Sequence, residues 1–161
     1  MRTRRSVVVA VLCIATLALM AGCVPPMKRS LGVSANDVVA IEYFQYPWSQ
    51  LPETLPRLTV RNREAIRSWA KAFRNVPVTD YSLSEEDSLK GQETQATRFL
   101  LRDGTSVEIT KIWVGPHNSV VMWPDGTASR TEWGSPDLMS GYDGTVETVD
   151  AAEVPHAELP D

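Results

Sequence analysis

The stretch RFLLRDGTSVEITKIWVGPHNSVVMWPDGTASRTEW, residues 98–133, decides the fold. It contains four runs rich in β-branched and aromatic residues, separated by short turn-forming segments at 103–104, 115–118 and 124–126. Asp-Gly between two such runs is a strong hairpin signal, and short loops make neighbouring strands antiparallel. The stretch therefore predicts an antiparallel meander with strands at 98–102, 105–114, 119–123 and 127–133.

Alternation along these strands predicts which side chains are buried. In the second strand Val107, Ile109 and Trp113 fall on one face, because successive side chains of a strand point to opposite faces. Lys111 interrupts that face, and the sequence offers no reason for it. The last strand is polar, which is typical of a sheet edge.

Upstream of the meander, residues 62–75 predict the main helix. Apolar residues recur at the spacing of one helix face, at Ile66, Trp69, Ala70 and Phe73. Asn62 is a favourable N-cap, and Pro77 stops the helix from continuing. With a strand at 37–45, these elements predict an α+β domain of two layers, in which one main helix packs on one face of an antiparallel meander.

The remaining segments predict less regular structure. Residues 46–56 contain three prolines and predict a loop, and the polar, acidic segment 78–97 predicts a second surface loop. The Asp-Gly-Thr sequence of the hairpins occurs a third time at Asp143. It permits one further strand at 146–149, ahead of an acidic tail at 151–161 that we expect to be disordered.

The N-terminus has the layout of an export signal. Arg2, Arg4 and Arg5 form a basic segment, and residues 7–20 form an apolar run broken only by one threonine. Small residues then precede Cys23. Basic, apolar and small-residue segments in this order are typical of a secretory signal peptide.

The sequence LALMAGC at residues 17–23 resembles a bacterial lipoprotein signal with its lipobox. The resemblance implies that Cys23 carries a diacylglyceryl group and that the chain is cut just before it. Acyl chains of that kind give durable membrane attachment. An uncleaved membrane anchor and a soluble secreted product are the alternatives. The adjacent Arg4 and Arg5 also resemble a twin-arginine export motif, whereas the strongly apolar run favours ordinary secretory export.

These signals divide the chain into four parts. Residues 1–22 are the signal peptide, 23–36 a tether, 37–135 the α+β domain, and 136–161 a further hairpin with the acidic tail. Removal of the signal takes away three arginines, so the net charge of −4 becomes −7. This acidic balance argues against nucleic-acid binding. The domain is expected to lie outside the cytoplasm, at the cell membrane.

Signals for catalysis are weak. The chain contains no Gly-x-Ser-x-Gly, His-Glu-x-x-His, Walker or dinucleotide-binding pattern. His117 lies two residues from Ser119, but such a pair makes no triad without a third group and an oxyanion site. We therefore predict that the protein is not an enzyme and uses no cofactor or metal.

Two binding hypotheses remain. The first is a lipoprotein that binds an envelope protein partner through Trp48, in the proline-rich loop, and through Arg67 and Arg74 on the basic helix face. The second is a glycan-binding or small-ligand-binding module. It would use three tryptophans that recur at ten-residue spacing near strand ends, at Trp113, Trp123 and Trp133.

Overall fold

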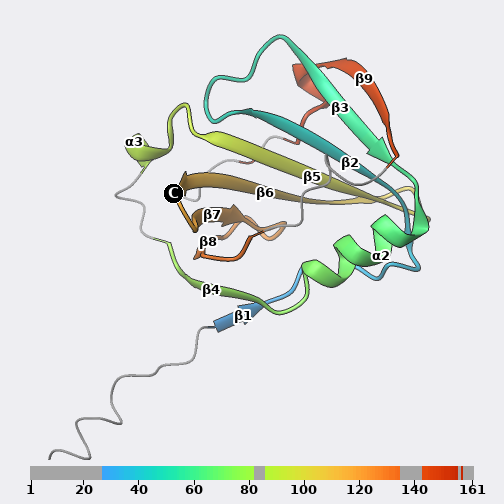
Figure 1. Ribbon diagram of the computed structural model, residues 1–161, viewed down its shortest axis with the longest axis horizontal. Coiled ribbons are helices and arrows are strands. Elements are labelled where there is room, and N and C mark those ends of the chain that lie inside the picture. Colours follow the sequence, from blue (N-terminus) through green and yellow to red (C-terminus); the bar gives the residue numbers. More distant parts are fainter. Residues whose placement is uncertain (1–26, 82–85, 135–142, 156, 158–161) are drawn as a thin grey trace, which may run out of the picture.

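The computed structural model describes residues 27–81, 86–134, 143–155 and 157. Within them the chain forms one nine-stranded sheet with a main helix, as Figure 1 shows. The strands are β1 (Met27–Arg29), β2 (Val38–Pro47), β3 (Thr54–Val60), β4 (Val76–Asp80), β5 (Glu93–Leu101), β6 (Ser106–Gly115), β7 (Asn118–Met122), β8 (Ala128–Thr131) and β9 (Thr145–Asp150). The helical segments are α2 (Arg63–Ala72), α3 (Glu86–Leu89) and the short 3-10 turn η2 (Ala151–Glu153).

The strands lie in the order β1-β4-β8-β7-β6-β5-β2-β3-β9, and every neighbouring pair is antiparallel. The run β5 to β8 follows the chain, which confirms the predicted antiparallel hairpins. The prediction that the last strand of this run forms an edge is wrong. β8 pairs with β7 on one side and, through Ser129 and Arg130, with β4 on the other. The edges are β1 and β9, at opposite ends of the described chain.

The helix α2 forms where the apolar spacing predicted it. The side chain of Asn62 accepts hydrogen bonds from the backbone N–H groups of Glu64 at 2.8 Å and Ala65 at 3.2 Å. These bonds satisfy two of the donors that every helix start leaves unpaired. The helix ends at Ala72, ahead of Asn75, which adopts a left-handed backbone with φ of 57°.

The main core lies between α2 and one face of the sheet. Trp69 of the helix is buried against Tyr43, with ring centroids 6.1 Å apart, and the C-cap residue Phe73 is buried against Phe99, with ring centroids 5.8 Å apart. Two smaller clusters lie on the opposite face, because alternate residues of each strand point there. One contains Phe44, Tyr46, Leu55, Ala96, Val149 and Val154, and the other contains Leu89, Ile112, Val120 and Met122.

The two segments predicted as loops, 46–56 and 78–97, contain more strand than expected. Within 78–97, β4 ends at Asp80 and β5 begins at Glu93. Thr94 is fully buried there. A threonine is polar, but its β-branched side chain packs well against neighbours on the face of a sheet. Within 46–56, β3 begins at Thr54 and includes Pro56. Its pairing with β2 starts one residue later, so no β2 residue lies opposite the proline.

Both ends of the domain extend further than predicted. Residues 27–36 of the expected tether contain β1, and Val33 is buried in the main core. The expected tail contains η2 and the buried Val154. The further strand predicted at 146–149 is β9, and it pairs with β3 rather than within a local hairpin. These segments are short or polar, so their pairing depends on distant strands that local patterns do not reveal.

The Asp-Gly-Thr sequences form two equivalent turns. In each, the aspartate accepts two hydrogen bonds from the threonine. The glycine between them adopts a positive φ, of 86° at Gly104 and 80° at Gly126. Hydrogen bonds from Thr105 lower the pKa of Asp103, and those from Thr127 lower the pKa of Asp125. The third copy differs. A Cβ on Gly144 would lie 2.5 Å from Leu58 Cδ1, so this glycine permits close packing of β9 on β3.

Candidate binding sites

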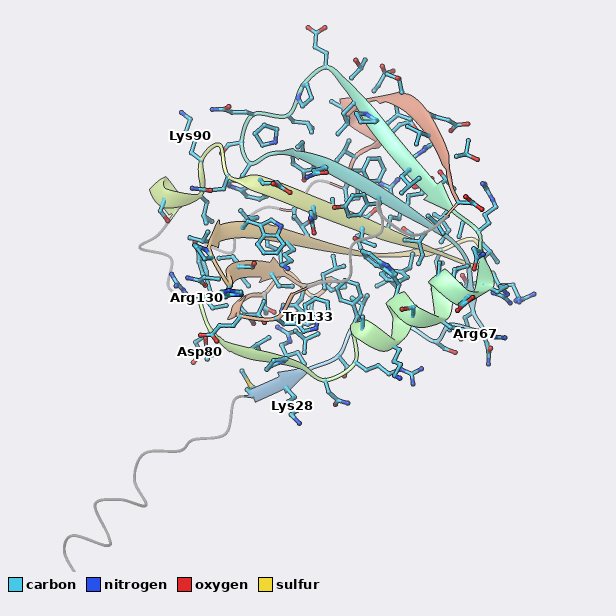
Figure 2. The ribbon with its side chains drawn as sticks, in the orientation of Figure 1. Lys28, Arg67, Asp80, Lys90, Arg130 and Trp133 are labelled. Atoms are coloured by element: carbon cyan, nitrogen blue, oxygen red, sulfur yellow. The ribbon has the colours of Figure 1, made fainter. Side chains whose placement is uncertain are left out.

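A basic surface covers the outer side of α2. Arg67 and Arg74 are exposed, and so is Lys71 between them. Figure 2 places Arg67 on the outer side of α2, away from β9. Glu64 is the one acidic residue between positions 61 and 75, which also contain five basic residues.

The same surface continues onto β1. The backbone N–H of Leu31 donates to Phe73 O at 3.0 Å, and that of Asn75 donates to Ser30 Oγ at 3.0 Å. These two bonds join the end of β1 to the end of α2. Lys28 of β1 is exposed, and Figure 2 shows it on the same lower side of the molecule. We call the set Lys28, Arg67, Lys71 and Arg74 the basic face.

The indole ring of Trp48 is not fully exposed to solvent. It is half-buried and packs against the cluster around Leu89. Its backbone N–H donates to Gln92 O at 2.8 Å, and its carbonyl accepts from Gly91 N at 2.9 Å. The start of the proline-rich segment is therefore tied to the turn before β5.

Trp123 is buried, with 4% of its surface exposed. The guanidinium of Arg29 lies 4.5 Å from its ring centroid and donates to Asp125 Oδ2 at 2.6 Å. Such a contact is a cation–π interaction that fixes β1 on the turn after β7. A ring so enclosed cannot stack on a sugar, so Trp123 does not serve the predicted platform.

Trp113 and Trp133 enclose Lys111 instead of forming a flat surface. The Lys111 ammonium lies 3.8 Å from the Trp113 ring centroid and 5.5 Å from that of Trp133. It also donates to Trp133 O at 3.1 Å. Burial lowers the pKa of Lys111 to about 8. The structure thus explains why Lys111 can interrupt the apolar face of β6. The indole rings and a carbonyl replace water around its ammonium.

A cavity beside Lys111 is too small for an organic ligand. Its volume is about 10 Å³, and Trp69, Phe73 and Thr97 contribute to its walls. A site that holds one water needs about that space. The buried lysine is therefore a structural feature of the core rather than a ligand pocket.

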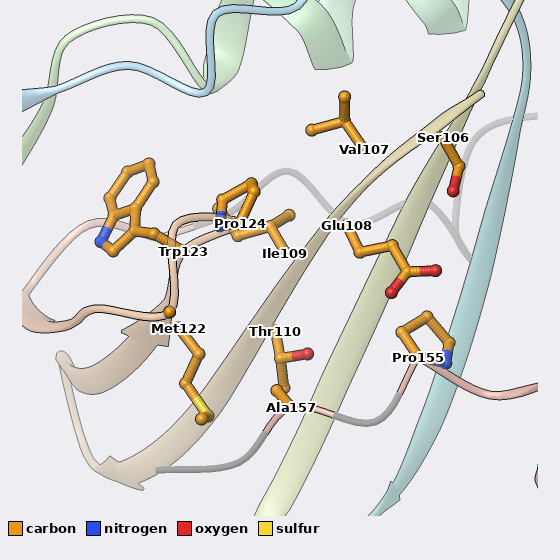
Figure 3. A pocket seen from close by; sticks show the side chains of 11 residues that line it. Ser106, Val107, Glu108, Ile109, Thr110, Met122, Trp123, Pro124, Pro155 and Ala157 are labelled. Atoms are coloured by element: carbon orange, nitrogen blue, oxygen red, sulfur yellow. The ribbon is translucent and has the colours of Figure 1, made fainter. Parts of the chain in front are cut away.

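The larger hollow lies where the sheet opens between β6 and the turn after β7. Its volume is about 620 Å³, within the range of about 300–1,000 Å³ that ligand sites occupy. Figure 3 shows Trp123 on one side of it, and Glu108 with the neighbouring Pro155 of the C-terminal segment on the other. We call this hollow the edge cleft. Its lining includes Ser106, Val107, Glu108, Met122, Trp123 and Pro155.

One wall of the edge cleft is unpaired backbone. β6 pairs with β5 from Ser106 to Ile112, but with β7 only from Thr110 onward. In the described residues no strand lies beside positions 106–109 on the side away from β5. Four residues of β6 therefore form an open strand edge inside the sheet.

The register shows which backbone groups face the cleft. The N–H of Leu101 donates to Thr105 O at 2.8 Å, so these two residues form a hydrogen-bonded pair at the hairpin. Bonded and non-bonded pairs alternate along an antiparallel ladder. Val107 and Ile109 therefore bond to β5, whereas the N–H and C=O groups of Ser106 and Glu108 point into the cleft. Sequence reasoning missed this site, because it depends on where β7 ends relative to β6.

The Glu108 side chain belongs to a ladder of charges across the sheet. Its carboxylate accepts from Arg98 Nε at 2.6 Å, and Arg98 donates to Glu42 at 3.0 Å. Arg57 lies 3.5 Å from Glu42 and donates to Glu147 and Glu153, each at 2.8 Å. Glu147 and Glu153 form the acidic end of this ladder, at the β9 edge.

The residues considered for catalysis are not brought together. His117 is exposed in the turn between β6 and β7, with φ of 57°, whereas Ser119 is buried within the sheet. Among the described residues, no three His, Cys, Asp or Glu side chains are grouped closely enough to hold a metal ion. In the same residues, no helix has the length and apolar character needed to cross a membrane.

Comparison with known proteins yields no relative. No family model, no curated protein and no solved structure matches the chain.

Proposed function

We propose that the chain is an exported lipoprotein, held at the membrane by a lipid on Cys23, whose domain is a non-catalytic binding module. Its ligand is an extended segment of another envelope protein, which adds to β6 as a further strand in the edge cleft. We also interpret the domain as two layers, with α2 as one layer and the sheet as the other. The observation that carries the proposal is the open backbone of Ser106 and Glu108.

Strand addition fits the chemistry of this cleft. An unpaired strand edge presents N–H and C=O groups that favour pairing with another chain. Extended peptides bind in this way, with main-chain hydrogen bonds for affinity and side-chain contacts for specificity. The accessible apolar side chains of the lining, Val107, Pro124 and Ala157, provide such side-chain contacts. A small molecule without a peptide backbone would leave several of these edge groups unpaired.

The anchor is supported by the position of the first strand. β1 begins at Met27, four residues after Cys23. The signal pattern and the lipobox precede it directly. A lipid on Cys23 would therefore hold the domain, and its cleft, close to the membrane where envelope proteins are met.

The first test places a photoreactive amino acid at Ser106 in the full-length chain, expressed in its own host. Ser106 is exposed at the mouth of the cleft. Irradiation should give an adduct with one envelope protein, and mapping should place the link in an extended segment of it. The same group at Lys90, which is exposed near the other end of β6, is the matched control and should not give this adduct.

A backbone variant then tests the strand edge itself. Glu108→Pro removes an N–H that faces the cleft and should leave the β5 ladder intact, whereas Glu108→Ala removes the same carboxylate but keeps the N–H. The proline should lower the adduct yield about tenfold relative to alanine, the cost of about one hydrogen bond. Equal yields from two folded variants would exclude strand addition. Loss from both would assign binding to the carboxylate, and no protein adduct from the wild type would exclude a protein ligand there.

A further inference from the structure

Charge is distributed unevenly along the sheet. The edge that includes β9 is acidic, with Glu147, Asp150 and Glu153 exposed. The opposite edge, β1, joins the basic face at the end of α2. Figure 1 shows β9 and β1 at opposite extremes of the molecule. The chain is acidic overall, so the four exposed cations of the basic face, one on β1 and three along α2 and its end, run against the average charge.

The basic face adjoins the point where the lipid anchor would enter. Four peptide units separate Cys23 from Met27, so their Cα atoms lie at most about 14 Å apart. Met27 itself has 53% of its surface exposed, although it is apolar. Lys28 follows it, and Arg74 lies one residue from Asn75, which bonds to Ser30. An anchored domain therefore has this side within about one or two Debye lengths of the lipid surface.

We propose that the basic face docks on anionic lipid headgroups of the membrane that holds the anchor. This inference rests on the proposed lipid at Cys23. Clusters of Lys and Arg beside a membrane attachment bind anionic lipid by charge, and the attraction falls off within a Debye length. Met27 enters the interface beside the acyl chains, and the acidic β9 edge points away from the surface. Docking thus fixes the orientation of the domain, which a lipid alone leaves free.

Lysine footprinting tests this orientation directly. The chain has four lysines, of which Lys28 and Lys71 belong to the basic face, Lys90 is exposed elsewhere, and Lys111 is buried. The lipidated mature chain, purified from its host, is placed in vesicles of phosphatidylcholine, with or without about one third phosphatidylglycerol. Acetylation of Lys28 and Lys71 should slow about fivefold in the anionic vesicles only, and Lys90 should not change. About 1 M salt should remove the protection, because it shortens the Debye length to about 3 Å.

Charge reversal supplies the matched variants. Arg67→Glu with Arg74→Glu should abolish the protection of Lys28 and Lys71. Lys90→Glu with Arg102→Glu changes the net charge equally away from the basic face and should preserve it. Both double variants should keep the fluorescence of the buried tryptophans, which reports an intact core.

The outcomes separate this inference from the anchor. Failure of the chain to remain on neutral vesicles contradicts the lipid anchor. Retention with equal labelling of Lys28, Lys71 and Lys90 overturns the docking of the basic face. Protection that is the same in neutral and anionic vesicles overturns the recognition of lipid charge. Protection in intact cells but in neither kind of vesicle assigns the basic face to an acidic protein instead.

Discussion

Lys111 lies in the main core, where two indole rings and the Trp133 carbonyl surround its ammonium. Burial favours the neutral amine, and it lowers the pKa from 10.5 to about 8. Between pH 8 and 10.5 the unfolded chain therefore binds more protons than the folded one. The free energy of unfolding rises with pH across this window, and the cost of burying the charged Lys111 is fully present below pH 8.

Replacing Lys111 by methionine should remove that pH dependence. Between pH 7 and 9.5 the wild type should gain about 2 kcal/mol in the free energy of unfolding relative to Lys111→Met, at about 1.4 kcal/mol per pH unit. Urea denaturation at the two pH values measures the difference. Parallel changes in both proteins would show that Lys111 keeps its ordinary pKa in the fold.

Gly144 is a second residue whose role depends on space. A Cβ there would meet Leu58 Cδ1 at 2.5 Å and Thr59 O at 3.0 Å. Gly144→Ala should therefore lower the free energy of unfolding by about 1–3 kcal/mol, as overpacking does. Gly134→Ala is the control, because nothing lies within 4 Å of its added Cβ. Equal stability of the two variants in urea would mean that β9 does not pack closely on β3.

At the scale of elements, α2 depends on its N-cap. Asn62→Ala removes the acceptor of the Glu64 and Ala65 N–H bonds. The expected loss is about 1 kcal/mol in the free energy of unfolding. Arg61→Ala, one residue earlier and exposed, should change stability by less than about 0.5 kcal/mol. Thermal unfolding of the two variants compares them, and similar melting temperatures would contradict the capping role.

The elements that sequence predicted well are those with local signals. The helix carries its apolar spacing and cap, and the hairpins carry their Asp-Gly turns, so both follow from residues close in the chain. β4 and β1 lack such signals, because each pairs only with strands distant in sequence. β9 follows the third Asp-Gly-Thr, but nothing local indicates that its partner is β3. Buried threonines such as Thr94 further disguise β5 as a polar loop.

The candidate sites divide in the same way. The basic surface around Arg67 and Arg74 follows from helical periodicity, and both residues are exposed as periodicity requires. The edge cleft could not be predicted from the sequence, because it depends on β7 being shorter than β6 and on the C-terminal segment forming a wall. Trp123 leaves the predicted tryptophan platform because it is buried in the main core, and regular spacing in the chain does not reveal burial.

At the scale of the whole molecule, the sheet has three different boundaries. β9 is an acidic edge, β1 is an edge beside the basic face, and residues 106–109 of β6 form an opening within the sheet. The two proposals use the last two of these boundaries. In these proposals, one end of the domain contacts lipid and the interior opening binds a protein segment.

Hydrogen exchange of the β6 backbone tests this account most directly. In the isolated protein, the amides of Ser106 and Glu108 should exchange fast, while those of Val107 and Ile109, which bond to β5, should exchange slowly. In the crosslinked complex the amide of Glu108 should become as slow as that of Ile109. Slow exchange of Glu108 in the isolated protein, or no change in the complex, would contradict an open strand edge that binds a partner.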